Sequence, residues 1–209
     1  AGNIDPVTIQ SIEDHKFEVE AKLNNQIGDS IGFGMGNVRE NITRPFNIAG
    51  QLPVPVDDYH FNQYEVELKS SVSRWFSGGL SITCCNIYDG DYLAVDTEVE
   101  LRPSKHLRFI FEYKVQDYSL PSGDLTVHVG SMEAGINFTP DMQIDTQIQY
   151  DNISEQFSFF GRFRWFPKPE TEFFVALRHS ADIQSDAFPQ SFRSEQTQAI
   201  IRLGHTFRF

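Results

Sequence analysis

The sequence predicts an all-β fold: an antiparallel up-and-down transmembrane β-barrel, of which this chain supplies about eleven strands. Three observations predict it. From Phe17 onward, apolar and polar residues alternate with period two, which is typical of half-buried strands. The apolar positions are rich in phenylalanine, of which the chain has 19, whereas the alternate positions are mostly charged. Most segments have roughly 9–14 residues, and about 9–11 are enough to cross a bilayer obliquely.

The alternation divides the chain into two regions. Residues 1–16 are mixed and polar and form an N-terminal segment, and residues 17–209 form the barrel region. Around Val129 to Met132 the alternation breaks, so we expect a β-bulge near Gly130. Elsewhere it is clearest at 17–23, 64–68, 93–101, 107–115, 142–150, 157–165 and 199–209.

Two classes of connection alternate along the chain. Short turns at 25–29, 75–79, 102–106, 138–141 and 166–170 alternate with longer or more acidic connections at 41–59, 88–92, 117–124, 151–156 and 181–195. Short turns at one end and longer loops at the other are typical of outer-membrane barrels. The adjacent Cys84 and Cys85 are predicted to form neither a disulfide nor a metal clamp, because neighbouring strand residues point to opposite faces.

The alternation also assigns side chains to faces. Membrane barrels turn apolar side chains to lipid and polar ones to the lumen. The predicted lipid-facing residues are Phe109, Phe111, Phe157, Phe159, Ile201 and Leu203. The predicted lumen-facing residues are Asp96, Glu98, Glu100, Arg108, Glu112, Lys114, Arg162, Arg164, Arg178, Arg202 and Arg208. In all, nine acids and nine bases of the strands share this polar face, so the lumen is expected to be nearly neutral. Acids dominate the early strands and arginines the last three, which predicts cross-strand pairs or a polarised wall.

The last strand of the sequence ends on Phe207 and Phe209. A terminal aromatic residue closing an alternating strand resembles the C-terminal signal of bacterial outer-membrane proteins, which their barrel-assembly machinery reads. The resemblance implies that Phe207 and Phe209 act as an assembly signal.

Several turn segments stand out along the chain: 46–48 with Pro53, Pro55 and 58–59, then 88–91, 102–107, 120–124, 149–152 and 162–165. In this order they resemble the C-terminal barrel of an uncharacterised family of bacterial outer-membrane proteins. Members of that family typically begin with a carbohydrate-binding-like module of the family 9 type, followed by a large barrel domain of unknown function. The resemblance covers about 45–209, whereas the module has no counterpart here and residues 1–40 are only weakly similar. It implies a bacterial outer-membrane location and a barrel architecture, but no chemistry. Because bacterial single-chain barrels have even strand numbers, eleven strands predict an incomplete barrel: a fragment, or a barrel completed by residues 1–16 or by another chain.

Composition and motifs restrict the function further. The net charge of −12, from 29 acidic and 17 basic residues, argues against a nucleic-acid binder. No phosphate loop, zinc-spaced Cys/His set or nucleophile elbow occurs, so we expect no enzyme, no cofactor and no metal site.

Three hypotheses remain. The first is an outer-membrane pore, or a sleeve for a partner protein. The second is a non-conducting envelope scaffold that anchors a binding module or an assembly, and the third is a soluble ligand-binding β-barrel. The expected partners are the lipid bilayer, the barrel-assembly machinery and another protein chain that completes or plugs the barrel.

Overall fold

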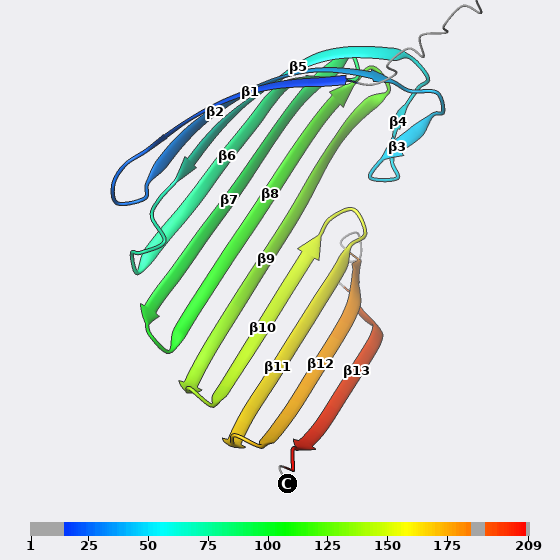
Figure 1. Cartoon of the computed structure of the whole chain (residues 1–209). Helices are drawn as coiled ribbons and strands as arrows, with labels where there is room; N and C mark the ends of the chain where they lie inside the picture. The colour runs from blue at the N-terminus through cyan, green and yellow to red at the C-terminus, as the bar shows by residue number, and fades with distance from the viewer. Residues whose placement is uncertain (1–14, 185–190, 208–209) are drawn as a thin grey trace, which may run out of the picture.

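The computed structural model describes residues 15–184 and 191–207, and nearly all of them belong to one antiparallel sheet (Figure 1). The sheet has eleven strands, and a separate two-stranded hairpin, β3–β4, branches off between β2 and β5. The strands of the sheet are β1 His15–Asn24, β2 Ser30–Asn41, β5 Asp58–Lys69, β6 Phe76–Ile87, β7 Gly90–Ser104, β8 Leu107–Leu120, β9 Gly123–Thr139, β10 Met142–Asp151, β11 Gln156–Lys168, β12 Thr171–Gln184 and β13 Ser191–His205, and the hairpin is β3 Phe46–Ile48 and β4 Leu52–Val54.

Each strand of the sheet pairs with its neighbours in chain order, so the topology is an up-and-down meander. The predicted all-β, antiparallel up-and-down sheet of about eleven strands is confirmed, whereas its closure into a transmembrane barrel stays a prediction. Period-two alternation specifies such a sheet well, because a slip of one residue would move a whole set of apolar side chains to the charged face. No helix among the described residues is long and apolar enough to cross a membrane.

The predicted contrast between short and long connections is wrong in part. Two of the connections expected to be long are two-residue turns, Tyr88-Asp89 and Pro121-Ser122, because the flanking strands continue further than predicted. Tyr88 and Asp89 both have positive φ, as a tight hairpin turn of type I′ requires. We call the end of the sheet that carries the turns at 25–29, 70–75, 105–106, 140–141 and 169–170 the turn end, and the opposite end the hairpin end.

The bulge predicted near Gly130 is absent. Gly130 pairs in continuous register with Tyr113 of β8 and Tyr150 of β10. The alternation breaks there because glycine adds no side chain to the apolar face. The irregularity in β9 lies instead beside Phe138, where the register with β10 shifts.

The prediction for the two cysteines is also wrong. Cys84 and Cys85 form a disulfide with each other. A cis peptide bond joins them, so this pair departs from the regular strand geometry on which the prediction depended.

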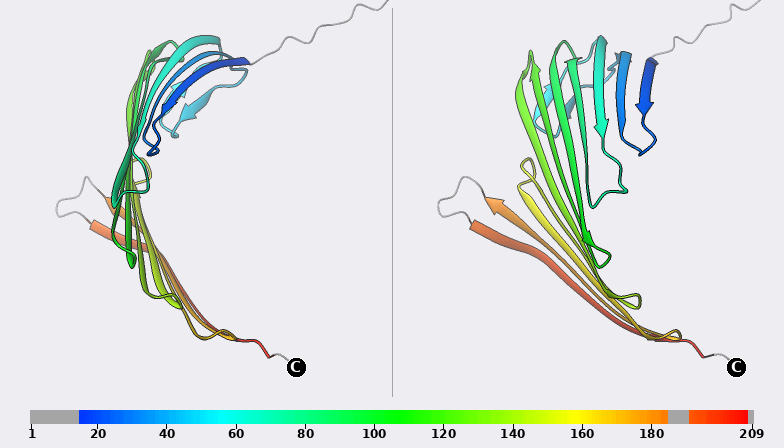
Figure 2. Two further views of the ribbon diagram at one scale, coloured as in Figure 1. Left: turned by 60° about the vertical axis from the view of Figure 1, so that its left-hand side comes forward. Right: turned by 90° about the vertical axis from the view of Figure 1, so that its left-hand side faces the viewer.

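The sheet is strongly curved, and the β3–β4 hairpin lies on its concave side (Figure 2). The buried core sits there, between the hairpin and the sheet. β1 and β13 are the two edges of the sheet and do not pair with each other. In a meander of eleven strands the first and last run in the same direction, so the antiparallel pattern cannot close between β1 and β13 alone.

Candidate functional site

The convex face of the sheet carries a band of exposed apolar side chains. The register places the six predicted lipid-facing residues on this one face; for example, Phe111, Met132, Ile148 and Phe159 form a row across four strands. Ile201 and Leu203 of β13 are 73% and 74% exposed. These side chains therefore do not point into a closed protein core, which is where a soluble barrel would place them.

Polar and aromatic residues border this apolar band. Towards the hairpin end, Asn37 donates a hydrogen bond of 2.8 Å to Asn62, and Thr126 donates one of 2.8 Å to Asp117. Tyr113, midway along β8, is exposed and contacts His128 at 3.0 Å. Towards the turn end, Trp75 and Trp165 are exposed. Belts of Trp and Tyr at both borders of an apolar band are typical of side chains at a membrane–water interface.

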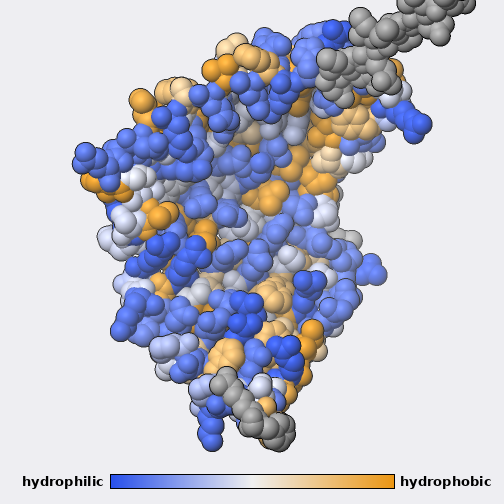
Figure 3. Space-filling model, in the orientation of Figure 1, coloured by the Kyte–Doolittle hydropathy of each residue, from blue (hydrophilic) through white to orange (hydrophobic). Residues whose placement is uncertain are grey.

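The concave face carries the charged residues, and we call it the concave wall. The register places on it all the predicted lumen-facing residues that the structure describes; Arg208 lies outside the described residues, as does Phe209. Figure 3 shows this side of the molecule, and hydrophilic residues cover most of it. That the wall faces water in a lumen remains a prediction.

Most bases of the concave wall are already paired with acids on the same strand or a neighbouring one. Glu100, whose side chain is only 4% exposed, pairs with both Arg102 and Arg108. The other pairs are Lys114 with Asp96 at 3.2 Å, Arg162 with Asp145 at 2.7 Å, Arg164 and Arg202 with Glu172 at 3.2 and 3.1 Å, and Lys22 and Lys69 with Glu67.

Several acids of the wall have no ion pair within the described residues. Glu98 of β7 lies directly opposite Glu112 of β8, and like charges in that position repel. Glu112 accepts a hydrogen bond of 2.8 Å from Ser131. A groove of about 400 Å³ runs past these residues, with Glu67, Lys69, Asp96 and Lys114 also in its lining. Among the described residues, no cluster of His, Cys, Asp and Glu has the arrangement of a metal site.

The charge balance of the wall differs from the expected neutrality. Glu133 shares this face, since it pairs with Ile110 and Gln147, and Glu172 joins it through its two arginines. Sequence reasoning missed Glu133 because the broken alternation beside Gly130 hid its face, and it missed Glu172 and Arg102 because they border turns. The additional acids make the described wall more acidic than expected.

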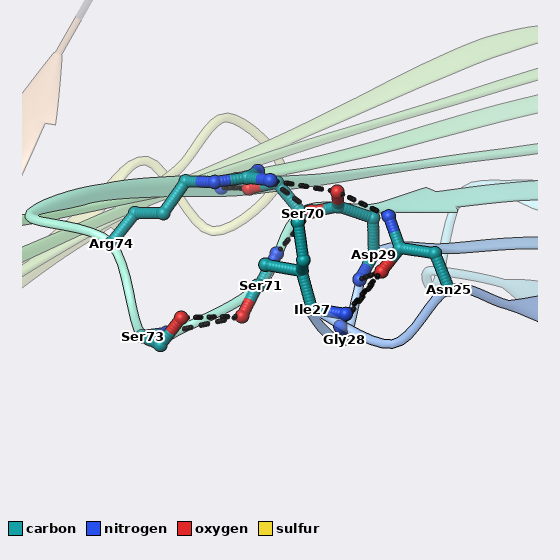
Figure 4. A network of polar contacts seen from close by, with 9 residues as sticks. Asn25, Ile27, Gly28, Asp29, Ser70, Ser71, Ser73 and Arg74 are labelled. Atoms are coloured by element: carbon teal, nitrogen blue, oxygen red, sulfur yellow. Dashed lines mark hydrogen bonds and ion pairs between the residues drawn. The ribbon is translucent and has the colours of Figure 1, made fainter.

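A polar network joins two connections at the turn end (Figure 4). Arg74 donates two hydrogen bonds of 2.7 Å to the Asp29 carboxylate, which also accepts one from the Ser71 amide at 2.8 Å and one from Asn25 at 2.8 Å. These donors, Arg74 first among them, hold the pKa of Asp29 well below its usual range. The network fixes the β1–β2 turn against the β5–β6 connection.

No protein-family model matches this sequence, and a search of curated proteins found no match. Among solved structures, a NanC porin is similar, with a TM-score of 0.38 and 10% sequence identity over 93% of this chain and 94% of that chain. At this TM-score the likeness carries no argument about function.

Proposed function

We propose that this chain forms the wall of a bacterial outer-membrane β-barrel that conducts hydrophilic solutes. One observation carries the proposal: an exposed apolar face and a charged face lie on opposite sides of the same eleven-stranded sheet. Exposed apolar surface of this extent mainly occurs where a protein meets a membrane or another protein. A lipid-facing exterior with a polar interior is the arrangement of membrane barrels.

The barrel requires further strands. Because β1 and β13 run in the same direction, antiparallel closure takes an odd number of additional strands. Another chain, or further strands of a longer chain, would supply them, in line with the family resemblance of 45–209. The barrel-assembly machinery would insert the product, with Phe207 and Phe209 as its signal.

The second candidate function is a sleeve or an anchor, and the ion pairs of the concave wall support it. A wall whose arginines are already neutralised fits a surface covered by a partner or plug. The pore is better supported, because Glu98, Glu112 and Glu133 have no ion pair within the described residues and lie on an open face. Such carboxylates would favour cations in a water-filled lumen.

Reversal potentials of the full chain in planar bilayers, measured across a salt gradient, test the pore. Changing Arg162, Arg164 and Arg202 to Gln removes cations and frees Asp145 and Glu172, so selectivity should shift towards cations. Changing Glu98 and Glu112 to Gln should shift it towards anions. Asp141→Asn, in a turn outside the wall, removes one negative charge and should leave the selectivity unchanged.

Three results would count against the pore. A chain that inserts but conducts nothing in any variant would favour the anchor, and arginine variants that only loosen its assembly would point to a sleeve. A current whose selectivity ignores both sets of wall residues would show that ions take another path.

A further inference from the structure

The segment between β2 and β5 does not join the sheet. Its strands β3 and β4 pair with each other, Phe46 with Val54 and Ile48 with Leu52, and the hairpin folds back over the concave side of the sheet (Figure 2). A segment on the inner side of a barrel wall would occupy part of the lumen. Its position therefore bears directly on which solutes pass.

Burial holds the hairpin in place. Val54 is fully buried and Leu52 is 3% exposed, and both belong to the core cluster that includes Tyr59 and Phe61 of β5. The cluster also contains Ile42, which follows β2, and three residues from strands further along the sheet: Tyr118 and Leu120 of β8 and Leu125 of β9. The hairpin thus lies across the inner side of several strands.

Hydrogen bonds fix its backbone as well. Ser122, in the turn between β8 and β9, donates a hydrogen bond of 2.7 Å to the carbonyl of Pro53. The Tyr59 hydroxyl donates one of 3.1 Å to the carbonyl of Pro55, and the amide of Ile42 donates one of 2.9 Å to the carbonyl of Asp57. Contacts of this number are typical of a fixed element rather than a mobile lid.

Aromatic rings pack beneath the hairpin. Tyr88 makes edge-to-face contacts with Phe46, Tyr59 and Phe61 at centroid distances of 5.2 to 5.7 Å. Its hydroxyl donates a hydrogen bond of 3.0 Å to Glu40, and burial raises the pKa of Tyr88 above its ordinary value. The tyrosine therefore stays protonated and keeps this donor.

The tip of the hairpin, in contrast, has open space around it. Ala49 and Gly50 have positive φ, and a Cβ placed on Gly50 would meet nothing within 4 Å. Gln51, the next residue, is exposed.

Because the base of the β3–β4 hairpin is buried and its tip is exposed, we propose that the hairpin is a fixed constriction of the pore. The constriction would set the largest size of solute that the pore admits. The proposal rests on the proposed pore function. Where the hairpin lies on the concave side, apolar packing replaces the charged wall. The hairpin therefore narrows the channel, while the charged residues of the wall stay along the ion path.

Charge variants at the tip test the proposal in the full chain. Gln51→Lys should shift the reversal potential towards anions and Gln51→Glu towards cations, because the tip borders the narrowed path. Gln26→Lys and Gln26→Glu are the matched controls, since Gln26 is an exposed glutamine in a turn at the opposite end. They should leave the reversal potential unchanged.

A second measurement uses neutral polymers of graded size. Leu52→Ser with Val54→Ser should unseat the hairpin, raise single-channel conductance and admit larger polymers than the native chain excludes. If the double variant fails to fold, the Gln51 variants decide the matter alone. Gln51 variants that behave like the Gln26 controls in a conducting chain would overturn the constriction and leave the pore intact. A native chain that never conducts would overturn both.

Discussion

At the scale of single residues, the polarity of the surroundings differs more between the two faces of one strand than between any two strands. In β11, Ser158 lies on the concave wall and Phe159 on the convex face, yet they are neighbours in sequence. Phe160 is apolar but shares the concave wall with Arg178, whose guanidinium lies 6.0 Å from its ring centroid. Hydropathy alone predicts that Phe160 faces lipid, whereas the register places it on the concave wall.

This difference predicts that substitution by arginine lowers the free energy of unfolding more on the convex face than on the concave wall. Phe159→Arg places a charge in the apolar band and should lower the free energy of unfolding in lipid vesicles by about 2–4 kcal/mol, the cost near a bilayer midplane. Ser158→Arg, one residue away on the polar face, should cost far less. Chemical unfolding of both variants measures the difference, and equal costs would argue against a lipid-facing convex side.

At the scale of elements, the network of Asp29 and Arg74 makes turn-end stability depend on pH. The folded-state pKa of Asp29 lies below the value of about 3.9 for an unfolded chain, so its contribution is complete above that pH. The contribution is lost as the pH falls through the folded pKa. Arg74→Gln should therefore lower the thermal unfolding midpoint at neutral pH, and this deficit should shrink below about pH 4.

Melting curves of the native chain and the variant across that pH range test this prediction. Lys105→Gln, which removes a cation from another turn, is the control and should show no pH-dependent deficit. A deficit of Arg74→Gln that stays constant down to low pH would mean that the carboxylate of Asp29 does not contribute through its charge.

The sequence predicted the strands of the sheet and their faces well, because period two and chain-order pairing are local signals. It did not reveal the β3–β4 hairpin, since the two prolines of Leu52-Pro53-Val54-Pro55 are typical of a loop. The core beneath the hairpin depends on contacts between residues as distant as Leu52 and Leu125, which no local pattern contains. The tight turn at Tyr88-Asp89 was missed because Tyr88 adopts positive φ, which is rare for a bulky residue.

At the scale of the whole molecule, the central feature is a curved sheet with a charged inner side, an apolar outer side and two unpaired edges. Exposed strand edges invite pairing with further strands. Within the described residues, β1 and β13 are the unpaired edges that further strands would have to join to close the wall.

The most direct test of this account is the solvent of each face, measured on the intact chain in lipid vesicles. Single spin labels at positions 157 to 160 of β11 would report collision rates with oxygen, which partitions into lipid, and with a water-soluble nickel chelate. The account predicts a period of two: labels at 157 and 159 collide mainly with oxygen, and labels at 158 and 160 with the chelate. Uniform collision rates along the strand, or the opposite alternation, would contradict it.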